Sequence, residues 1–218
     1  MKKLPSAFIF DMDGTMIDSE PHMTTARAEL FTRFGMPLSF EQNIRTGTHK
    51  SIYWAKAIAE YAIPYTVDEL IAMEQDEAAE IMKKEISAPA NGLVELLDFA
   101  KANGIRLGVA SSSIRSYVVT LLKHLKIDGY FTSLCCGDDK IEHKPAPEPY
   151  LKVCNELGVE PKDCIAFEDS YIGSLSPLNA GIPCVGFNGY TQSDLSNCFV
   201  VVNDFKDIIK IFTQGENL

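Results

Sequence analysis

The sequence lacks long apolar runs and an excess of positive charge. No apolar run approaches the ~18 residues that a membrane-spanning helix requires. The apolar stretch near the start is broken by Pro5 and stops at Asp11, too early for a secretion signal. The formal net charge is −10, which disfavours nucleic acid and anionic membranes as partners because both bind basic surfaces. We therefore expect a soluble protein.

Paired cysteine motifs are missing as well. The 218 residues include six cysteines, and none of them forms a Cys-x-x-Cys pair. Most lie in apolar runs, so we expect buried, reduced thiols, which fit a cytoplasmic protein. The composition, 46% hydrophobic and 10% aromatic, is that of a globular protein with a substantial core.

Hydrophobic patterning divides the sequence into two kinds of segment. The apolar run at residues 7–10 predicts a buried strand. The residues after it carry apolar side chains at helical spacing, which predicts three or four short helices. Later predicted strands and helices alternate, as in a parallel sheet with helices on both faces. We predict a doubly wound, Rossmann-like α/β core over 1–15 and 89–218, with a small α-helical domain inserted over 16–88.

Five strands and five helices are predicted in the second part of the core. The strands are 105–110, 131–136, 164–167, 183–187 and 199–202. The helices are 93–102, 114–125, 147–157, 171–180 and 204–213. Pro177 falls inside the fourth of these helices, so this helix is either kinked there or begins later.

Polar side chains suited to chemistry follow four of the predicted strands. They are Asp11 and Asp13 after the first strand, Ser111 after the second, Lys144 in the loop after the third, and Glu168 and Asp169 after the fourth. Ligands of a doubly wound sheet bind beyond the carboxyl ends of its strands, so we expect these side chains to converge. Carboxylates, a lysine and a hydroxyl suit phosphoryl transfer, because they can hold Mg²⁺ and an anionic phosphoryl group.

The acids at these strand ends are the candidate catalytic and metal-binding groups. No histidine or cysteine stands there, so Asp11 is the candidate nucleophile and would form an aspartyl phosphate. Asp13 would protonate the leaving oxygen and later deprotonate water. Asp11 and Asp169 would ligate Mg²⁺, since this ion prefers oxygen ligands.

The hydroxyls and the lysine are the candidate phosphate-binding groups. Ser111 would bind a phosphate oxygen, and Ser112 is a second candidate. Ser113 precedes a predicted helix, so we expect it to be the helix cap. Lys144 would contact both the phosphate and the nucleophile.

Four motifs of this chain resemble those of the haloacid dehalogenase-like hydrolases. They are Asp11-Met12-Asp13-Gly14-Thr15, Ser111, the stretch from Lys144 to Pro149, and Phe167-Glu168-Asp169-Ser170. Asp18-Ser19-Glu20 and the helical insert resemble the subgroup that contains β-phosphoglucomutase and small sugar-phosphate phosphatases. The resemblance implies Asp11 as nucleophile, and Asp13 as acid/base with its backbone carbonyl on the Mg²⁺. It also implies that Glu168 lies at or near the metal.

The resemblance further implies an α-helical cap that closes over the site, hinged near residues 15–20 and 86–90. His22 and Lys50 are the candidate substrate contacts from this cap. Residues 46–50 resemble the cap loop that faces the active site, in which a basic residue of the mutase grips a second phosphate. A solvated lysine at a helix start explains Lys50 equally well. For Trp54 we expect core packing.

A Mg²⁺-dependent phosphatase acting on a small phosphorylated metabolite, a sugar phosphate, is the first hypothesis. A β-phosphoglucomutase-like sugar phosphomutase is the alternative, because water or a sugar hydroxyl can collect the same aspartyl phosphate. Residues 18–22 depart from the mutase pattern. A catalytically silent binding protein would have lost Asp11 or Asp169, and both are present. We expect a cytoplasmic monomer whose partner is its small phosphorylated substrate.

Overall fold

The computed structural model describes residues 4–37, 50–190 and 192–214, and the chain forms two compact units. The core unit comprises residues 1–18 and 87–218, and the helical unit comprises residues 19–86. The sequence predicts the insert over 16–88, so the two divisions of the chain differ by a few residues at each boundary.

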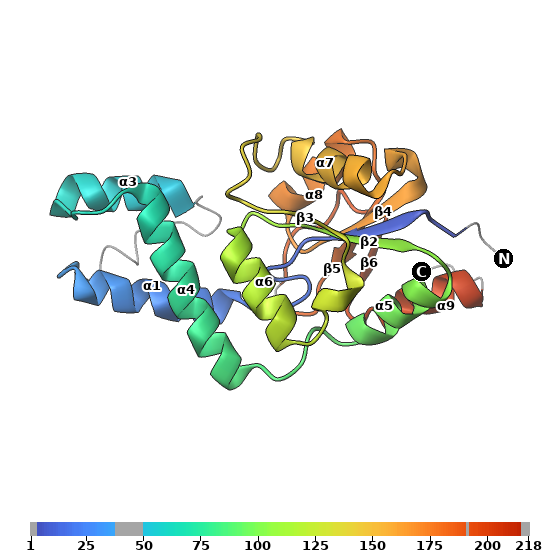
Figure 1. Ribbon diagram of the computed structural model, residues 1–218, viewed down its shortest axis with the longest axis horizontal. Coiled ribbons are helices and arrows are strands. Elements are labelled where there is room, and N and C mark those ends of the chain that lie inside the picture. The colour runs from blue at the N-terminus through green and yellow to red at the C-terminus, as the bar shows by residue number, and fades with distance from the viewer. Residues whose placement is uncertain (1–3, 38–49, 191, 215–218) are drawn as a thin grey trace. The chain divides into compact units, whose positions relative to one another are not determined.

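A parallel β-sheet forms the centre of the core unit (Figure 1). Within the described residues its strands are β1 (Ala7–Phe10), β2 (Arg106–Ala110), β3 (Ser133–Cys135), β4 (Cys164–Glu168), β5 (Cys184–Phe187) and β6 (Val200–Val202). Their order across the sheet is β3-β2-β1-β4-β5-β6, and every neighbouring pair is parallel. The first strand therefore lies between β2 and β4, and the predicted parallel sheet is confirmed.

The central strand is apolar along its whole length because both of its faces are covered. All four residues of β1 are buried, as expected for a strand inside a parallel sheet. Side chains alternate between the faces of a strand. Ala7 and Ile9 belong to one apolar cluster. Phe8 and Phe10 both pack against Phe167 of β4, and the rings of Phe10 and Phe167 stack with centroids 4.5 Å apart.

Helices cover both faces of this sheet (Figure 1). On one face lie α7 (Glu148–Leu157) and α8 (Tyr171–Asn179), and on the other lie α5 (Leu93–Ala102), α6 (Arg115–His124) and α9 (Lys206–Thr213). Two short 3₁₀ helices, η1 (Asp128–Tyr130) and η2 (Pro161–Asp163), precede β3 and β4. The doubly wound, Rossmann-like α/β core is thus confirmed.

Pro177 lies inside α8 and does not determine where this helix begins. The helix begins at Tyr171, where the sequence predicts it, and continues to Asn179. Its first turn is capped by Ser170, whose hydroxyl accepts a hydrogen bond from the Gly173 N–H at 3.1 Å. Of the two alternatives left open by the sequence, a later start is therefore wrong.

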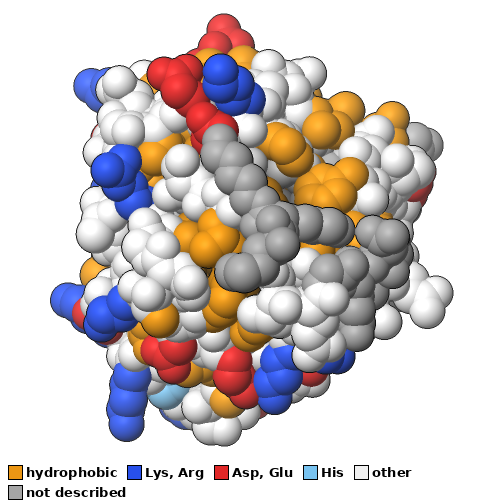
Figure 2. All heavy atoms as spheres, turned by 90° about the vertical axis from the view of Figure 1, so that its right-hand side faces the viewer, with side chains coloured by type: hydrophobic (Ala, Val, Ile, Leu, Met, Phe, Trp, Pro, Cys, Tyr) orange, Lys and Arg blue, Asp and Glu red, His pale blue; other side chains and the backbone are white. Residues whose placement is uncertain are grey.

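The amino ends of the strands lie at one edge of the sheet. Ligands of doubly wound folds bind at the opposite edge, beyond the carboxyl ends of the strands. A shallow hollow at this edge is lined by residues that precede or begin the strands: Leu4, Pro5, Lys162, Asp163, Cys164, Ile165, Pro183 and Phe199. Figure 2 views the molecule from this end and shows hydrophobic side chains lying between charged ones. Among the described residues, no helix has the length and apolar character needed to span a membrane.

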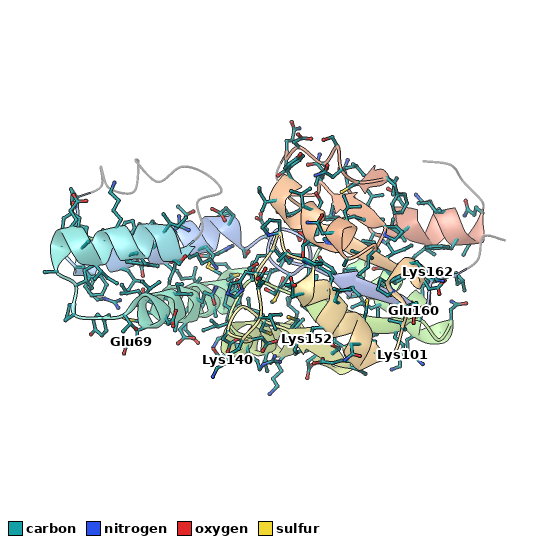
Figure 3. All side chains as sticks on the ribbon, turned by 90° about the horizontal axis from the view of Figure 1, so that it is seen from above. Glu69, Lys101, Lys140, Lys152, Glu160 and Lys162 are labelled. Atoms are coloured by element: carbon teal, nitrogen blue, oxygen red, sulfur yellow. The ribbon has the colours of Figure 1, made fainter. Side chains whose placement is uncertain are left out.

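The helical unit is built from amphipathic helices around its own core. Within the described residues these are α1 (Glu20–Arg33), α3 (Lys50–Tyr61) and α4 (Val67–Glu85). At the start of α4, Thr66 and Glu69 form a capping box, in which each side chain bonds to the other residue's backbone N–H. Figure 3 labels Glu69 in the helical unit. Trp54 is fully buried in the apolar cluster of this unit, which confirms the core packing expected for it.

A buried carboxylate ties the three helices together. Glu74 on α4 is fully buried. Its Oε1 accepts a hydrogen bond from Arg27 Nε on α1 at 3.1 Å, and its Oε2 accepts one from Trp54 Nε1 on α3 at 2.7 Å. The Tyr53 hydroxyl also donates to Oε2. A buried charge of this kind is tolerated because donors satisfy both of its oxygens.

We expect Glu74→Gln to destabilise the helical unit by about 3 kcal/mol, because it leaves the largely buried Arg27 guanidinium without its carboxylate. Trp54 is the only tryptophan of the chain and lies in this unit, so urea unfolding followed by its fluorescence reports the change. Glu80→Gln, at an exposed position of the same helix, is the matched control and should leave the midpoint unchanged. Equal shifts in the two variants would refute the assigned role of Glu74.

Candidate active site

Two neighbouring strands bring their terminal acids to one place. Asp11 follows β1, and its backbone N–H donates a hydrogen bond to the Phe167 carbonyl of β4 at 2.9 Å. The register pairs Phe10 with Phe167, so Asp11 lies level with Glu168, the last residue of β4. Asp169 follows directly. Parallel pairing thus creates the cluster from two local sequence motifs that are far apart in the chain: Asp11 and Phe167, which are hydrogen-bonded, are separated by 156 residues.

Three carboxylates share this place with one ammonium group. Carboxylate oxygens of Asp11, Glu168 and Asp169 lie within 4.8 Å of one another. The Lys144 Nζ donates to Asp11 Oδ1 and to Glu168 Oε1, each at 2.6 Å, and the Lys144 side chain is 7% exposed. A single lysine cannot neutralise three acids in such a buried setting. A divalent cation would, and an all-oxygen donor set is the kind that Mg²⁺ prefers.

The crowding of negative charge shifts the ionisation of these groups. Burial raises the pKa of Asp11 well above its usual value, against the opposing effect of Lys144. Burial and the charge of Glu168 raise the pKa of Asp169 to about 7. Burial disfavours the ammonium of Lys144, but Asp11 and Glu168 outweigh it and raise the Lys144 pKa. Protons and a metal ion would therefore compete for the carboxylates near neutral pH.

Two glycines let the backbone approach this cluster closely. Gly14 has a φ of +79°, and a Cβ built there would lie 2.1 Å from Asp169 Oδ2. At Gly173, in the first turn of α8, a Cβ would lie 2.1 Å from Glu168 Oε2. Any larger residue at either position would displace a carboxylate of the cluster.

Tyr150 is a member of the site that the sequence does not reveal. Its hydroxyl donates to Glu168 Oε1 at 2.7 Å, and Lys144 Nζ lies 5.2 Å from the centre of its ring. Tyr150 is fully buried on α7, at a position that reads as part of an apolar helix face. In the sequence Tyr150 stands six residues after Lys144, near the start of the helix that follows the proline-rich loop, and this position does not identify its partner.

Asp13 is held by two hydroxyls from another part of the chain. The Ser113 hydroxyl donates to Asp13 Oδ2 at 2.7 Å, and the Tyr117 hydroxyl donates to Asp13 Oδ1 at 2.8 Å. Ser113 stands two residues before α6 and Tyr117 lies in the first turn of this helix, so both donors come from its start. The sequence does not identify this role of Tyr117, because a tyrosine in a helix otherwise indicates core packing.

The three serines after β2 have different surroundings. Ser111 is buried, and its hydroxyl accepts a hydrogen bond from the Ser113 N–H at 3.0 Å. The side chain of Ser112 is exposed. The helix-cap role expected for Ser113 is wrong: the N-cap of α6 is Ile114, and Ser113 donates to Asp13 instead. Asp138 serves the helix start, because its Oδ1 accepts from the Arg115 N–H at 2.9 Å.

The predicted cap residues belong to the helical unit. His22 on α1 is half-buried, and its Nε2 lies 3.0 Å from Glu85 Oε2 at the end of α4. Lys50 is the first residue of α3 and is half-buried. Residues 46–49, which with Lys50 resemble a substrate-facing loop, lie outside the described residues.

Curated relatives of this chain include proteins named as phosphatases. The chain is 34% identical over 203 residues to validoxylamine A 7'-phosphate phosphatase of Streptomyces hygroscopicus subsp. limoneus, covering 92% of this chain and 94% of the relative. It is 30% identical over 182 residues to the fructose-1-phosphate phosphatase YqaB of Escherichia coli (strain K12), covering 83% and 95%.

Solved structures share the fold, and a family profile spans both units. The crystal structure of CbbY from Rhodobacter sphaeroides in complex with phosphate superposes with a TM-score of 0.82 at 24% identity, covering 94% of this chain and 96% of that one. The profile of the haloacid dehalogenase-like hydrolases matches residues 8–187, from the first strand to the fifth. The expected resemblance is confirmed, and the chain belongs to the haloacid dehalogenase-like hydrolases.

Proposed function

We propose that this enzyme is a Mg²⁺-dependent phosphatase that hydrolyses a small sugar phosphate through an aspartyl-phosphate intermediate. The observation that carries the proposal is the position of Asp11, paired with Lys144 at 2.6 Å and surrounded by two further carboxylates. A buried lysine that already orients a carboxylate can also attract the phosphate dianion to it. The named relatives, phosphatases of sugar-type phosphates, support this substrate class.

The residues of the core unit supply a nucleophile and an acid/base. In the first step an Asp11 oxygen bonds to phosphorus, the bond to the leaving oxygen breaks, and Asp13 gives that oxygen a proton. In the second step Asp13 takes a proton from water, the water oxygen bonds to phosphorus, and the bond to Asp11 breaks. Ser111, Ser112 and Lys144 are the proposed contacts of the phosphate oxygens.

The acidic cluster is the proposed metal site. Asp11 and Asp169 would hold Mg²⁺ with their carboxylates, Asp13 with its backbone carbonyl, and Glu168 would lie at or near the ion. When bound, the ion supplies positive charge that offsets the repulsion between carboxylates and phosphate. Lys144 meanwhile keeps Asp11 oriented through its hydrogen bond.

The helical unit is the proposed cap, with His22 and Lys50 as its candidate substrate contacts. We propose a monomeric enzyme of the cytoplasm. The described cysteines are free thiols, five of them buried, and this state fits a reducing compartment.

Phosphorus NMR of the purified enzyme with Mg²⁺ and a panel of sugar phosphates tests the reaction. The panel includes fructose 1-phosphate and β-glucose 1-phosphate with a trace of glucose 1,6-bisphosphate, and phosphoglycolate is added as a phosphate ester that is not a sugar. Growth of an inorganic phosphate signal is the expected result. Conversion of the 1-phosphate to the 6-phosphate without phosphate release would instead establish the phosphomutase. No change with any compound would count against both.

We expect Mg²⁺ to raise the thermal midpoint more at about pH 8 than at about pH 6, because protons compete with the metal for Asp169, whose pKa is about 7. Because the pKa of Asp169 is raised in the folded protein, the protonated carboxyl stabilises the metal-free fold. This contribution to the free energy of unfolding is lost as pH rises through about 7. Differential scanning calorimetry at constant ionic strength measures the shift.

Asp169→Asn and Asp194→Asn are the variants for this comparison. The first should lose most of the Mg²⁺-induced shift at either pH, and the second, at an exposed position, should behave as the wild type. A shift that is independent of pH in the wild type would contradict the role of Asp169 in metal binding.

A further inference from the structure

Asp13 has its two carboxylate oxygens bound by two hydroxyls that the proposed reaction does not use. We propose that Tyr117 and Ser113 are positioning residues, which hold the Asp13 carboxylate in the orientation that delivers a proton to the leaving oxygen. This inference rests on the proposed function, because it takes Asp13 as the acid/base of that reaction.

One donor on each oxygen fixes the carboxylate more firmly than two donors on one oxygen would. Tyr117 donates to Oδ1 at 2.8 Å and Ser113 donates to Oδ2 at 2.7 Å. The terminal torsion of an aspartate is soft, so its carboxylate rotates readily when nothing restrains it. Two donors from different directions remove that freedom, while Asp13 itself stays half-buried.

The two donors are themselves held in place. Ser113 and Tyr117 are each 1% exposed. The Ser113 carbonyl accepts from the Gly137 N–H at 2.7 Å, and its N–H donates to Ser111 Oγ at 3.0 Å. Tyr117 stands on α6, whose first N–H bonds to Asp138 at 2.9 Å. Both hydroxyls therefore come from backbone that is anchored by hydrogen bonds, as a precise functional site requires.

The same segment carries a proposed phosphate ligand. Ser111, which accepts the Ser113 N–H, is also the first serine after β2. The orientation of Asp13 is thus tied, through Ser113, to the position at which the phosphate is bound. A proton donor must lie within hydrogen-bond reach of the leaving oxygen. The connection through Ser113 would therefore keep the Asp13 carboxylate at a fixed position relative to the bound phosphate.

The hydroxyls can keep their bonds through both steps without giving up their own protons. A protonated carboxyl retains acceptor lone pairs on both oxygens, so Tyr117 and Ser113 can donate whether Asp13 is charged or neutral. The proton that leaves Asp13 goes to the leaving oxygen and is later replaced from water. Tyr117 and Ser113 therefore act through Asp13 and are not consumed or changed.

The test is a series of aryl phosphates of similar shape whose phenols differ in basicity, from p-nitrophenyl phosphate to phenyl phosphate and its methyl and methoxy derivatives. A weakly basic leaving group needs no proton, whereas a basic one does. We expect Tyr117→Phe and Ser113→Ala each to lower kcat/KM about tenfold for the most basic leaving group and less than about twofold for p-nitrophenyl phosphate. The double variant should lose more than either single variant at the basic end, and this loss should differ from the product of the two single losses because both donors share the Asp13 carboxylate.

Two further variants serve as controls. Tyr130→Phe removes a hydroxyl that donates to Asp98 on the surface at 2.6 Å, and it should leave the whole series unchanged. Ser113→Thr keeps the hydroxyl and should recover most of the loss seen in Ser113→Ala. Circular dichroism verifies the fold of each variant, and Ser113→Ala carries the test if Tyr117→Phe does not fold.

The outcomes separate the inference from the proposed function. A steeper dependence on leaving-group basicity in both single variants supports the inference. Equal losses across the series, no loss, or a gain at the basic end overturns it while the phosphatase stands. If neither the wild type nor Tyr130→Phe releases phosphate in the presence of Mg²⁺, from the aryl phosphates or from the sugar phosphates, the inference and the proposed function are both overturned.

Discussion

Asp11→Asn should lower phosphatase turnover by about 10⁴-fold or more while leaving the protein folded. A carboxamide has the shape of the carboxylate but is a very poor nucleophile, so no aspartyl phosphate forms. The fold should survive because Asn removes one of three crowded acidic groups, which lie within 4.8 Å of one another. Phosphate release with the best substrate of the NMR panel measures the loss.

A trapping experiment makes this prediction specific to the nucleophile. Acid quenching of the wild type during turnover of a ³²P-labelled substrate should leave label on the protein, and hydroxylamine should release it. Asp11→Asn should carry no label, whereas Asp194→Asn at an exposed position should match the wild type. Retained turnover or retained label in purified Asp11→Asn would remove Asp11 from the reaction.

Lys144→Met should abolish measurable turnover and destabilise the metal-free core unit by about 3–5 kcal/mol near neutral pH. Lys144 donates to Asp11 and to Glu168 from a side chain that is 7% exposed. Its removal leaves these buried acids without the ammonium group that pairs with two of them. Methionine is of similar length and apolar, so a cavity contributes little to the loss.

The pH dependence of this variant follows from the same charges. In the wild type, the raised pKa of Lys144 means that its stabilising charge is present below the usual lysine pKa and is lost only at strongly alkaline pH. Without it, the acids of the cluster are stabilised in their protonated forms. The defect should therefore shrink at about pH 5 and grow at about pH 8, and Mg²⁺ should recover part of it.

Urea unfolding at the two pH values, with and without Mg²⁺, measures these changes. Lys162→Met, at an exposed position on η2 (Figure 3), is the matched control and should leave stability and turnover unchanged. A defect of Lys144→Met that is the same at both pH values would show that lost packing, and not lost charge, is its cause.

Much of the core fold could be predicted because its signals are local. Continuous apolar runs such as residues 7–10 predict buried strands, and Gly158 at the end of α7 or Asn103-Gly104 after α5 predict where helices stop. Strand–helix alternation then limits the topology to a parallel, doubly wound sheet. The start of α8 was ambiguous because Pro177 conflicts with its helical neighbours, and a helix of nine residues nonetheless accommodates it.

The acids and the lysine of the site were also within reach of the sequence. Asp11, Glu168 and Asp169 stand at strand ends, and parallel pairing brings strand ends to one edge whatever the details of packing. Lys144 required one more assumption, that its loop turns inward. The bond from Lys144 to Asp11 at 2.6 Å agrees with that assumption.

Three members of the site are defined by packing and were not found in the sequence. Tyr150 and Tyr117 lie on helix faces that are otherwise apolar, so their hydroxyls gave no sign of their partners. The sequence predicts a helix cap at Ser113 because a serine before a helix commonly hydrogen-bonds to the local backbone. Its actual partner, Asp13, is 100 residues away in the chain.

The sequence by itself determined the family, the layered α/β architecture and the acids placed at the ends of β1 and β4. These follow from periodicity and from motifs a few residues long, which do not depend on distant partners. Only the tertiary structure decided which hydroxyl serves which carboxylate: Tyr150 on Glu168, and Ser113 with Tyr117 on Asp13. The physical reason is that a hydrogen bond needs both partners within about 3 Å, a condition set by the packing of α6 and α7 on the sheet.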